Sequence, residues 1–502
     1  MWRDEANTIA LATLPTISGV WQNLQYDSFP IVWLGVVRLL SAVAGPMNDS
    51  AFRVLGFFVG VSLVGALWFN ARVFGHRYPV VALALVALSP SVIRWGDSMR
   101  AYGIGMVLIV VTAALIWRFT DTPSVSRFVA ATIVGVLSVH SLYYNSVLLL
   151  AFCAGATAVA CSKREWKVVC QLIGIGGISA LSLLPYTMII RQAESWNSLV
   201  RIPHYTFDWF WIKLFETIAP AGVWVFFVWI ALLALVIPAG MAALLPRGFP
   251  LPARQREVAL FALVTLLTGA VGSFAFLRTL SYYTQPWYYL TLMLVVGLSV
   301  DILLGAIVRD NRLRMTLSLA ALVVGFGSVI AGWPVLNTRL TNADIVSSML
   351  QKTANEGDFI VVNPWYDGVS FDRYYRGHAP WMTVPAIGFH KYHRYDLIMS
   401  MVQSPDTVAP VQVVMDKAGS TLNAGGTVFL VGALRRSAQG VQRSTPTAAT
   451  AADQASQDEW SSRLDIFLAR HALQFDSIAV ASDRPVSRYE NMGIVAIRGW
   501  RR

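Results

Sequence analysis

The chain has 502 residues, of which 56% are hydrophobic and 13% are charged, and its formal net charge is +11 at pH 7. Soluble domains carry roughly twice that charged fraction, so the composition excludes a purely soluble protein and indicates a polytopic membrane protein with room for one soluble domain. Nucleic-acid binding is not indicated, because lysine and arginine fall mostly in short loops between apolar runs, where the positive-inside rule explains them.

Two adjacent carboxylates, Asp4 and Glu5, stand directly ahead of the apolar part of the chain. Neighbouring carboxylates disfavour each other's ionisation, and nearby lipid should raise at least one pKa, which suits a general base or a cation ligand. The alternative is a solvated pair at a helix start, where negative charge favours the positive end of the helix dipole.

An apolar stretch at residues 31–45 precedes ten further apolar runs and decides the predicted topology. The ten runs, each of roughly 20 residues, lie near residues 51–71, 78–94, 101–118, 128–142, 144–161, 168–190, 220–245, 257–277, 285–307 and 315–335. If residues 31–45 do not cross the bilayer, every basic loop falls on one side, which is the cytoplasm by the positive-inside rule. These loops are residues 72–77, 118–127, 162–167, 246–256 and 309–314.

We therefore predict a polytopic α-helical membrane protein of the inner membrane, with about ten transmembrane helices and a juxtamembrane helix at residues 31–45. Residues 1–50 form a first extracytoplasmic loop, residues 51–336 form the membrane module, and residues 337–502 are extracytoplasmic. Because an outside N-terminus has no preceding helix to carry it across, we also expect one more helix upstream of Trp2 in the true product or its relatives.

The C-terminal part changes to mixed polar composition and predicts a small α/β domain. Short β-like runs occur at residues 359–362, 428–431, 478–481 and 494–497, and residues 460–471 have a helix-like pattern. Residues 437–456 are rich in Ser, Thr, Ala and Gln without periodicity, which predicts a mobile loop.

Five motifs follow one another along residues 1–330. They are Trp2-Arg3-Asp4-Glu5-Ala6-Asn7, Asp27-Ser28-Phe29-Pro30, Arg53 at a helix start, Leu88-Ser89-Pro90 leading to Trp95-Gly96-Asp97-Ser98-Met99-Arg100-Ala101-Tyr102, and His140-Ser141-Leu142-Tyr143-Tyr144. In order and spacing they resemble the GT-C glycosyltransferases (family 39-like), and above all the bacterial relatives of protein O-mannosyltransferases and lipid A aminoarabinose transferase.

The resemblance implies transfer of a sugar from a polyprenyl-phosphate-linked donor lipid to a hydroxyl of a glycan, lipid or protein acceptor on the extracytoplasmic face, with inversion. Asp4 matches the family's first-loop aspartate and would deprotonate the acceptor, since an alcohol that attacks an anomeric carbon must lose its proton. Glu5 would orient the acceptor or support Asp4. In the family the acidic pair follows the first transmembrane helix, which would explain the helix missing here.

The chain departs from the family pattern beside two further acidic residues. Phe29-Pro30-Ile31 stands where relatives often have His-Pro-Pro or Lys-Pro-Pro, and Asp97-Ser98 stands where they often have Gln-Glu. Asp27 and Asp97 are therefore secondary substrate-binding candidates, with a turn or helix-cap role as the alternative.

A phosphate leaving group calls for cationic or hydroxyl donors at the outer membrane surface. Arg278, Tyr282 and Tyr283 are candidates because relatives often place an Arg and a Tyr before this late helix, although an interfacial aromatic belt is the alternative. In the loop of residues 191–219, Arg201 and His204 are further candidates for covering the carrier. Arg100 is also a candidate, with an ion pair to Asp97 as its alternative.

Other polar residues are read as structural. His140 is predicted to be a satisfied interhelical histidine. Asp301 is expected to snorkel or to cap a helix near the cytoplasmic end. The His-x-x-His spacing of His390 and His393 lacks companion ligands and predicts a surface turn. Residues 363–367 follow a predicted strand, where α/β domains often bind ligands, so acceptor recognition is an alternative there.

A transporter or flippase of lipid-linked glycans is the main competing function. It predicts internal repeats and ionisable residues buried in mid-helix, and neither is clear in the sequence. A catalytically silent envelope scaffold is a third reading. The chain has no Gly-rich nucleotide fingerprint, which argues against a soluble nucleotide-sugar donor. Adjacent carboxylates can hold a divalent cation, so a cation stays an open alternative, although we expect no tightly bound structural metal.

Overall fold

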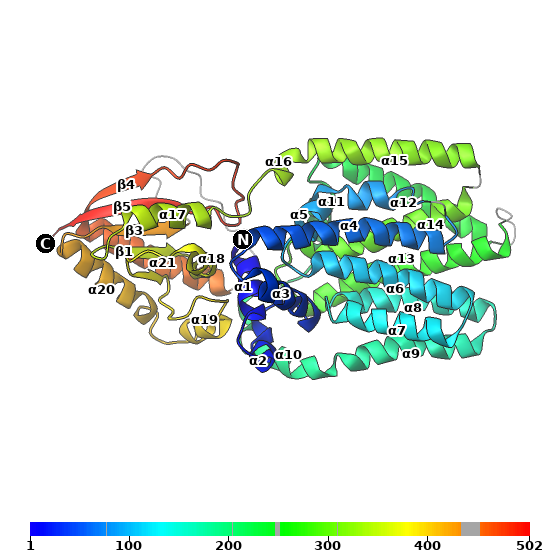
Figure 1. Ribbon diagram of the computed structural model, residues 1–502, viewed down its shortest axis with the longest axis horizontal. Coiled ribbons are helices and arrows are strands. Elements are labelled where there is room, and N and C mark those ends of the chain that lie inside the picture. The colour runs from blue at the N-terminus through cyan, green and yellow to red at the C-terminus, as the bar shows by residue number, and fades with distance from the viewer. Residues whose placement is uncertain (77, 203, 246–250, 309, 433–451, 502) are drawn as a thin grey trace.

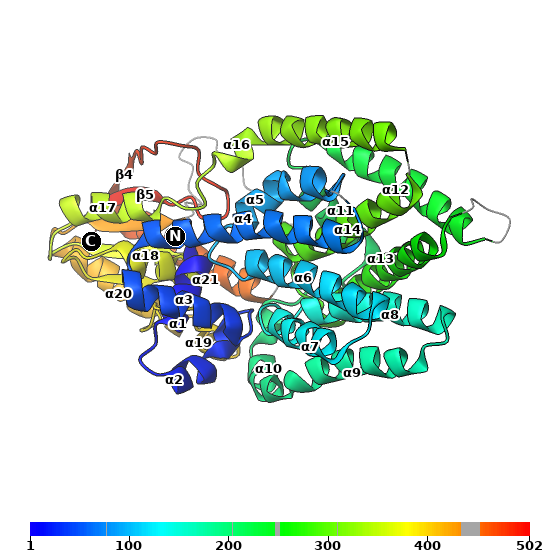
Figure 2. The same ribbon diagram turned by 45° about the vertical axis from the view of Figure 1, so that its right-hand side comes forward.

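A bundle of long helices and an α/β domain make up the protein, and the N-terminal helices lie where the two meet (Figure 1). The computed structural model describes residues 1–76, 78–202, 204–245, 251–308, 310–432 and 452–501. Figure 2 shows from a second direction that the α/β domain contacts one end of the bundle only.

Among the described residues, eight helices are long and apolar enough to cross a membrane. They are α4 (Asp49–Val73), α6 (Tyr102–Asp121), α8 (Asn145–Ser162), α9 (Trp166–Ser182) continuing into α10 (Thr187–Glu194), α12 (Val223–Leu244), α13 (Ala253–Leu280), α14 (Leu290–Ile307) with the turn before it, and α15 (Asn311–Ala331). The chain is therefore a polytopic, mostly helical protein, as predicted.

Two of the ten predicted runs differ from a single long helix. The run at residues 78–94 breaks into a π-helical turn, Leu83–Ala87, and the short helix α5, Pro90–Gly96. Proline disfavours helical backbone in the residue before it, and Ser89 is accordingly extended, so a new helix starts at Pro90. The run at residues 128–142 forms α7, Val125–Val139, which has 15 residues.

The stretch predicted to lie along the membrane is helix α3, Ile31–Ala44, with 14 residues. At 1.5 Å per residue it spans about 21 Å, which is less than the roughly 30 Å of a hydrocarbon core. It packs beside α1 (Arg3–Ala12), and the Arg38 guanidinium on α3 donates to the carbonyl of Ala12 at 2.9 Å. The length of α3 agrees with the prediction that this segment does not cross.

The basic loops gather at the end of the bundle far from the α/β domain (Figure 1). Lys163 pairs with Glu257 at 2.8 Å, and Arg254 pairs with Asp121 at 3.3 Å, so loops distant in sequence touch one another. The predicted grouping of these loops at one end is confirmed for their described residues.

Asp301 on α14 is a buried helix cap, one of its two predicted roles. Its carboxylate accepts the backbone N–H groups of Val80 and Val81 at 2.6 and 2.7 Å. These buried groups stand just before the π-helical turn, where they would lack an acceptor without Asp301.

The α/β domain is a five-stranded mixed sheet between two helical layers. Strand order is β2 (Trp381–Thr383), β1 (Phe359–Asn363), β3 (Val428–Gly432), β5 (Gly493–Trp500), β4 (Ala472–Ile478), with β2, β1 and β3 parallel and the other two pairings antiparallel. Helices α17 (Ala343–Thr353) and α18 (Gly368–Tyr374) cover one face, and α20 (Ala409–Asn423) and α21 (Ala452–His471) cover the other.

Predictions for this domain are right at three strands and wrong at the fourth. The strand expected at residues 478–481 instead occupies Ala472–Ile478 and follows α21 without a loop. Its side chains are largely exposed because it is an edge strand, so the apolar run after it was misleading. Most of the predicted mobile loop at residues 437–456 lies outside the described residues, and residues 452–456 begin α21.

We expect Asp301→Leu to lower the free energy of unfolding by about 1–3 kcal/mol, because two buried N–H groups lose their acceptor. Asp301→Asn keeps an oxygen in the same place and should lose less. Equilibrium unfolding in mixed micelles measures both, and equal losses in the two variants would contradict the capping role.

Candidate functional site

Helix α1 carries Asp4 and Glu5 in its first turn, between the bundle and the α/β domain (Figure 1). Successive residues of a helix point about 100° apart, so the two carboxylates leave the helix in different directions. Each therefore meets a different set of partners.

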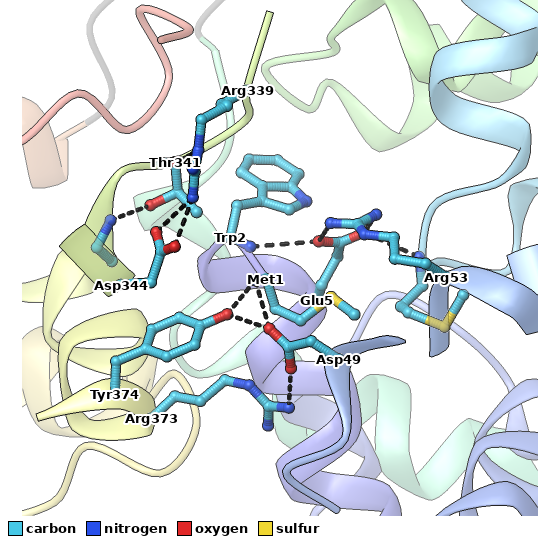
Figure 3. A network of polar contacts seen from close by, with 12 residues as sticks. Met1, Trp2, Glu5, Asp49, Arg53, Arg339, Thr341, Asp344, Arg373 and Tyr374 are labelled. Atoms are coloured by element: carbon cyan, nitrogen blue, oxygen red, sulfur yellow. Dashed lines mark hydrogen bonds and ion pairs between the residues drawn. The ribbon is translucent and has the colours of Figure 1, made fainter. Parts of the chain in front are cut away.

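Glu5 is fully buried and holds α1 against the bundle (Figure 3). Its two carboxylate oxygens pair with the two terminal nitrogens of Arg53 on α4, each at 3.1 Å. The backbone N–H of Met99 donates to one oxygen at 3.0 Å, and that of Trp2 donates to the other at 3.2 Å. With four donors on two oxygens, Glu5 is an anchor for the helix that carries Asp4.

Asp4 faces the α/β domain and keeps 25% of its side chain exposed. Its Oδ1 lies 3.5 Å from Nε2 of His393 and 4.0 Å from Nε of Arg3. Burial opposes ionisation of Asp4, but the His393 contact and the charges of Arg100 and Arg3 together lower its pKa. Asp4 is therefore an ionised, partly open carboxylate.

The prediction that adjacency raises a pKa in the acidic pair is wrong. Burial of Glu5 is likewise outweighed by Arg53 and by the N–H groups of Met99 and Trp2, which lower its pKa. The two carboxylates diverge on the helix, and each has its own cationic neighbour, so their mutual repulsion is a minor influence.

Arg100 joins Asp27 and α1 in a buried network beside Asp4. It donates to Asp27 at 3.0 Å, to the hydroxyl of Thr8 at 2.9 Å and to the carbonyl of Asp4 at 3.1 Å. Its guanidinium also lies 4.3 Å from the ring centroid of Phe29. Burial raises the pKa of Asp27, although Arg100 opposes the shift. The structure thus brings Asp27 and Arg100 to Asp4, and Arg100 does not pair with Asp97.

Asp97 belongs to the Glu5 side of α1. It ends α5, and its charged neighbours are Arg53, Glu5 and Arg94. Burial raises the pKa of Asp97 to about 6, with Arg53 opposing the shift and Glu5 adding to it.

The loop candidates form a separate group that meets the site through a tyrosine. Arg201 and Tyr282 pair as an antiparallel bridge, and Ile202 donates to the carbonyl of Ser281 at 2.8 Å. Tyr288, which follows this loop, interacts electrostatically with Arg100, Asp4 and Tyr282. Tyr282 and the Asp4 group therefore both lie near Tyr288.

The remaining candidates lie at the surface. Arg278 and His204 are exposed, and their side chains have no hydrogen bond or ion pair in the described part of the chain. Tyr283 is 39% exposed and packs on Trp209, with ring centroids 5.2 Å apart. These three do not contact Asp4.

Sequence reasoning did not predict that the α/β domain contacts Arg3. Arg3 donates to Asp367 at 3.3 Å and to the carbonyl of Tyr489 at 2.6 Å, while its backbone N–H donates to Glu490 at 2.8 Å. Burial raises the pKa of both Asp367 and Glu490, although Arg3 opposes the shift. The carboxyl end of β1, predicted as a ligand-binding edge, is thus part of the junction with α1.

His393 corrects the predicted surface turn, because it is only 4% exposed and faces Asp4. No local signal in the sequence could have found this contact, since the two residues are 389 positions apart (393 minus 4) in the chain. His140, by contrast, is satisfied as predicted, with Tyr186 at 3.0 Å and Ser182 at 2.9 Å from its two ring nitrogens.

Within the described ranges, no group of three or more His, Cys, Asp or Glu side chains is placed to hold a metal ion. No protein-family model matches the chain, and no curated protein matches it in sequence.

Asp97→Asn should raise the melting temperature at pH 8 by a few degrees and change it little at pH 4. In the wild-type folded protein the pKa of Asp97 is about 6, above the ordinary 3.8, so the folded state binds this proton more tightly than the unfolded state does. The folded state therefore loses stability as the pH rises from about 4 through 6. Asparagine mimics the protonated form and removes that loss. Thermal unfolding in detergent across this pH range measures it, with Asp208→Asn, an exposed carboxylate, as the control. A pH-independent difference would contradict the shift.

Proposed function

We propose that the protein is a membrane glycosyltransferase that moves a sugar from a polyprenyl-phosphate-linked donor to a hydroxyl acceptor, with Asp4 as the general base. The observation that carries the proposal is the contrast within the acidic pair. Glu5 is saturated by four donors, whereas Asp4 is ionised and keeps an oxygen without a hydrogen bond among the described residues. An acceptor hydroxyl therefore has one carboxylate to approach.

The proposed reaction is a single displacement that inverts the anomeric carbon. The acceptor oxygen forms a bond to that carbon while the bond to the phosphate oxygen breaks, and the bonding electrons leave with the phosphate. The acceptor proton passes to Asp4. A lowered pKa makes Asp4 a weak base, so proton transfer follows bond formation, when an oxocarbenium-like centre has already made the hydroxyl acidic.

The neighbouring residues hold this arrangement. Arg100 fixes Asp27, Thr8 and the backbone of Asp4 in one network, so it keeps the first two turns of α1 in place. Arg201 and Tyr282, paired across two loops, are the proposed contacts for the phosphate. Exposed Arg278, His204 and Tyr283 are assigned to the outer, lipid-facing part of that surface.

We place α1, α3 and the α/β domain on the extracytoplasmic side of the inner membrane. The support is the cluster of basic loops at the opposite end of the bundle, which the positive-inside rule assigns to the cytoplasm.

The test of activity is sugar transfer by the purified protein from a panel of polyprenyl-phosphate monosaccharides. Asp4→Asn should lower turnover by roughly 10²- to 10⁴-fold, because it removes the base and keeps the shape. Asp208→Asn removes an exposed carboxylate from α11 (Phe207–Ile218) and is the matched control. Wild-type turnover in Asp4→Asn would remove Asp4 from the mechanism, and a folded protein inactive on the whole panel would favour a flippase.

The test of sidedness is cysteine labelling in intact cells with a membrane-impermeant thiol reagent. In a background with Cys153, Cys161 and Cys170 replaced, Ser420→Cys on α20 should react, and Ser162→Cys at the far end of α8 should react only after permeabilisation. Both introduced positions are exposed. The reverse pattern would invert the proposed topology.

A further inference from the structure

His393 is a buried imidazole held in a fixed orientation at the junction. It lies in the segment between β2 and α19 (Tyr395–Val402). Its ring meets Trp365 at 5.7 Å with an interplanar angle of 87°, and Tyr395 at 5.5 Å with an angle of 38°. Two aromatic neighbours and 4% exposure leave the ring little freedom to turn toward solvent.

Helix α1 also holds the backbone of His393. The backbone N–H of His393 donates to Oδ1 of Asn7 at 2.8 Å, and Nδ2 of Asn7 donates to the carbonyl of Tyr26 at 3.1 Å. Asn7 stands three residues after Asp4, so the two side chains share one face of α1. One face of α1 therefore binds the backbone of His393 through Asn7 and places the carboxylate of Asp4 beside the His393 ring.

The imidazole nitrogens have no hydrogen bond of good geometry in the described part of the chain. Buried polar atoms are rarely left in this condition. Nε2 lies 3.5 Å from Oδ1 of Asp4, a few tenths of an ångström beyond a normal hydrogen bond. Arg3 and Arg100 are the other charged groups that act on the ring. The ring is thus directed at the carboxylate, with two cations close by.

Resting on the function proposed above, we propose that His393 is a positioning residue that makes the α/β domain part of the catalytic site. Its neutral imidazole donates the Nε2 proton to Oδ1 of Asp4 and leaves Oδ2 to receive the acceptor proton. Undocking of the domain removes the donor, so the base is correctly held only when the domain is docked on α1.

A purely structural histidine would fill space between Trp365 and Tyr395, and phenylalanine would replace it. His390, three residues earlier, is the matched control, because it is also an aromatic neighbour, of Trp381 at 4.3 Å, but does not contact Asp4. The two histidines separate a donor role from a packing role.

The first experiment tests the contact and needs no activity. The ¹⁵N NMR spectrum of histidine-labelled protein in micelles reports tautomer and titration of each ring, and His393→Gln assigns the His393 signals. We expect the Nε2–H tautomer at His393 and a lower titration midpoint in Asp4→Asn, because a carboxylate favours the imidazolium. His390 should not respond. Identical His393 signals in wild type and Asp4→Asn would overturn the contact.

The second experiment tests the role through turnover on the active donor. His393→Phe should lower kcat by roughly 10- to 100-fold, as expected for a misplaced catalytic group, with KM for the donor within about twofold. His393→Gln keeps an N–H donor and should retain more activity, and His390→Phe should be unchanged. If kcat is equal in His393→Phe and wild type while Asp4→Asn is inactive, the role proposed for His393 is overturned and the proposed function stands.

Two further outcomes are distinct from these. A wild-type protein without transferase activity on the panel would overturn the proposed function, and the role given to His393 would fall with it. If His393→Phe does not fold, the NMR result and the turnover of His393→Gln decide. The inference is overturned if His393→Gln is no more active than Asp4→Asn and the titration midpoint of His393 is the same in Asp4→Asn as in wild type.

Discussion

The arrangement of the protein depends on the interactions of the buried Glu5 carboxylate with its four hydrogen-bond donors. A carboxylate without water is tolerated only when charge and hydrogen bonds replace its hydration, and Arg53 with the N–H groups of Met99 and Trp2 does so. These partners come from α4, from the loop before α6 and from the start of α1 itself. Because loss of any of these partners would leave the buried carboxylate without compensation, the first turn of α1 is held in one position on the bundle.

That fixed helix lets one pair of identical functional groups take two roles. Glu5 points into the bundle and accepts hydrogen bonds from four donors, whereas Asp4 points to the domain and stays partly exposed. The environment, rather than the adjacency of the acids, sets their behaviour, and it lowers the pKa of both. The angle between successive residues at the helix start thus separates a buried anchor from a partly exposed carboxylate.

The sequence predicted the features that depend on local pattern or on the membrane. Apolar length located the long helices, charge placed the basic loops at one end, and Asp301 and His140 were recognised as structural. The failures at the site concern partners distant in sequence, whereas the misplaced strand β4 is a local failure at a sheet edge. Arg100 pairs with Asp27 and not with nearby Asp97, and His393 contacts Asp4 from a distant part of the sequence, so neither spacing nor composition predicts these two contacts.

The charged groups at the junction also link the position of the domain to the surroundings of Asp4. Asp367 and Glu490 share one arginine, Arg3, and burial raises the pKa of both because a single cation cannot offset two desolvated carboxylates. Arg3 is also the residue directly before Asp4. Any shift of the domain that moves Asp367 and Glu490 away from Arg3 also withdraws His393 from Asp4, so docking of the domain determines which groups surround this turn of helix.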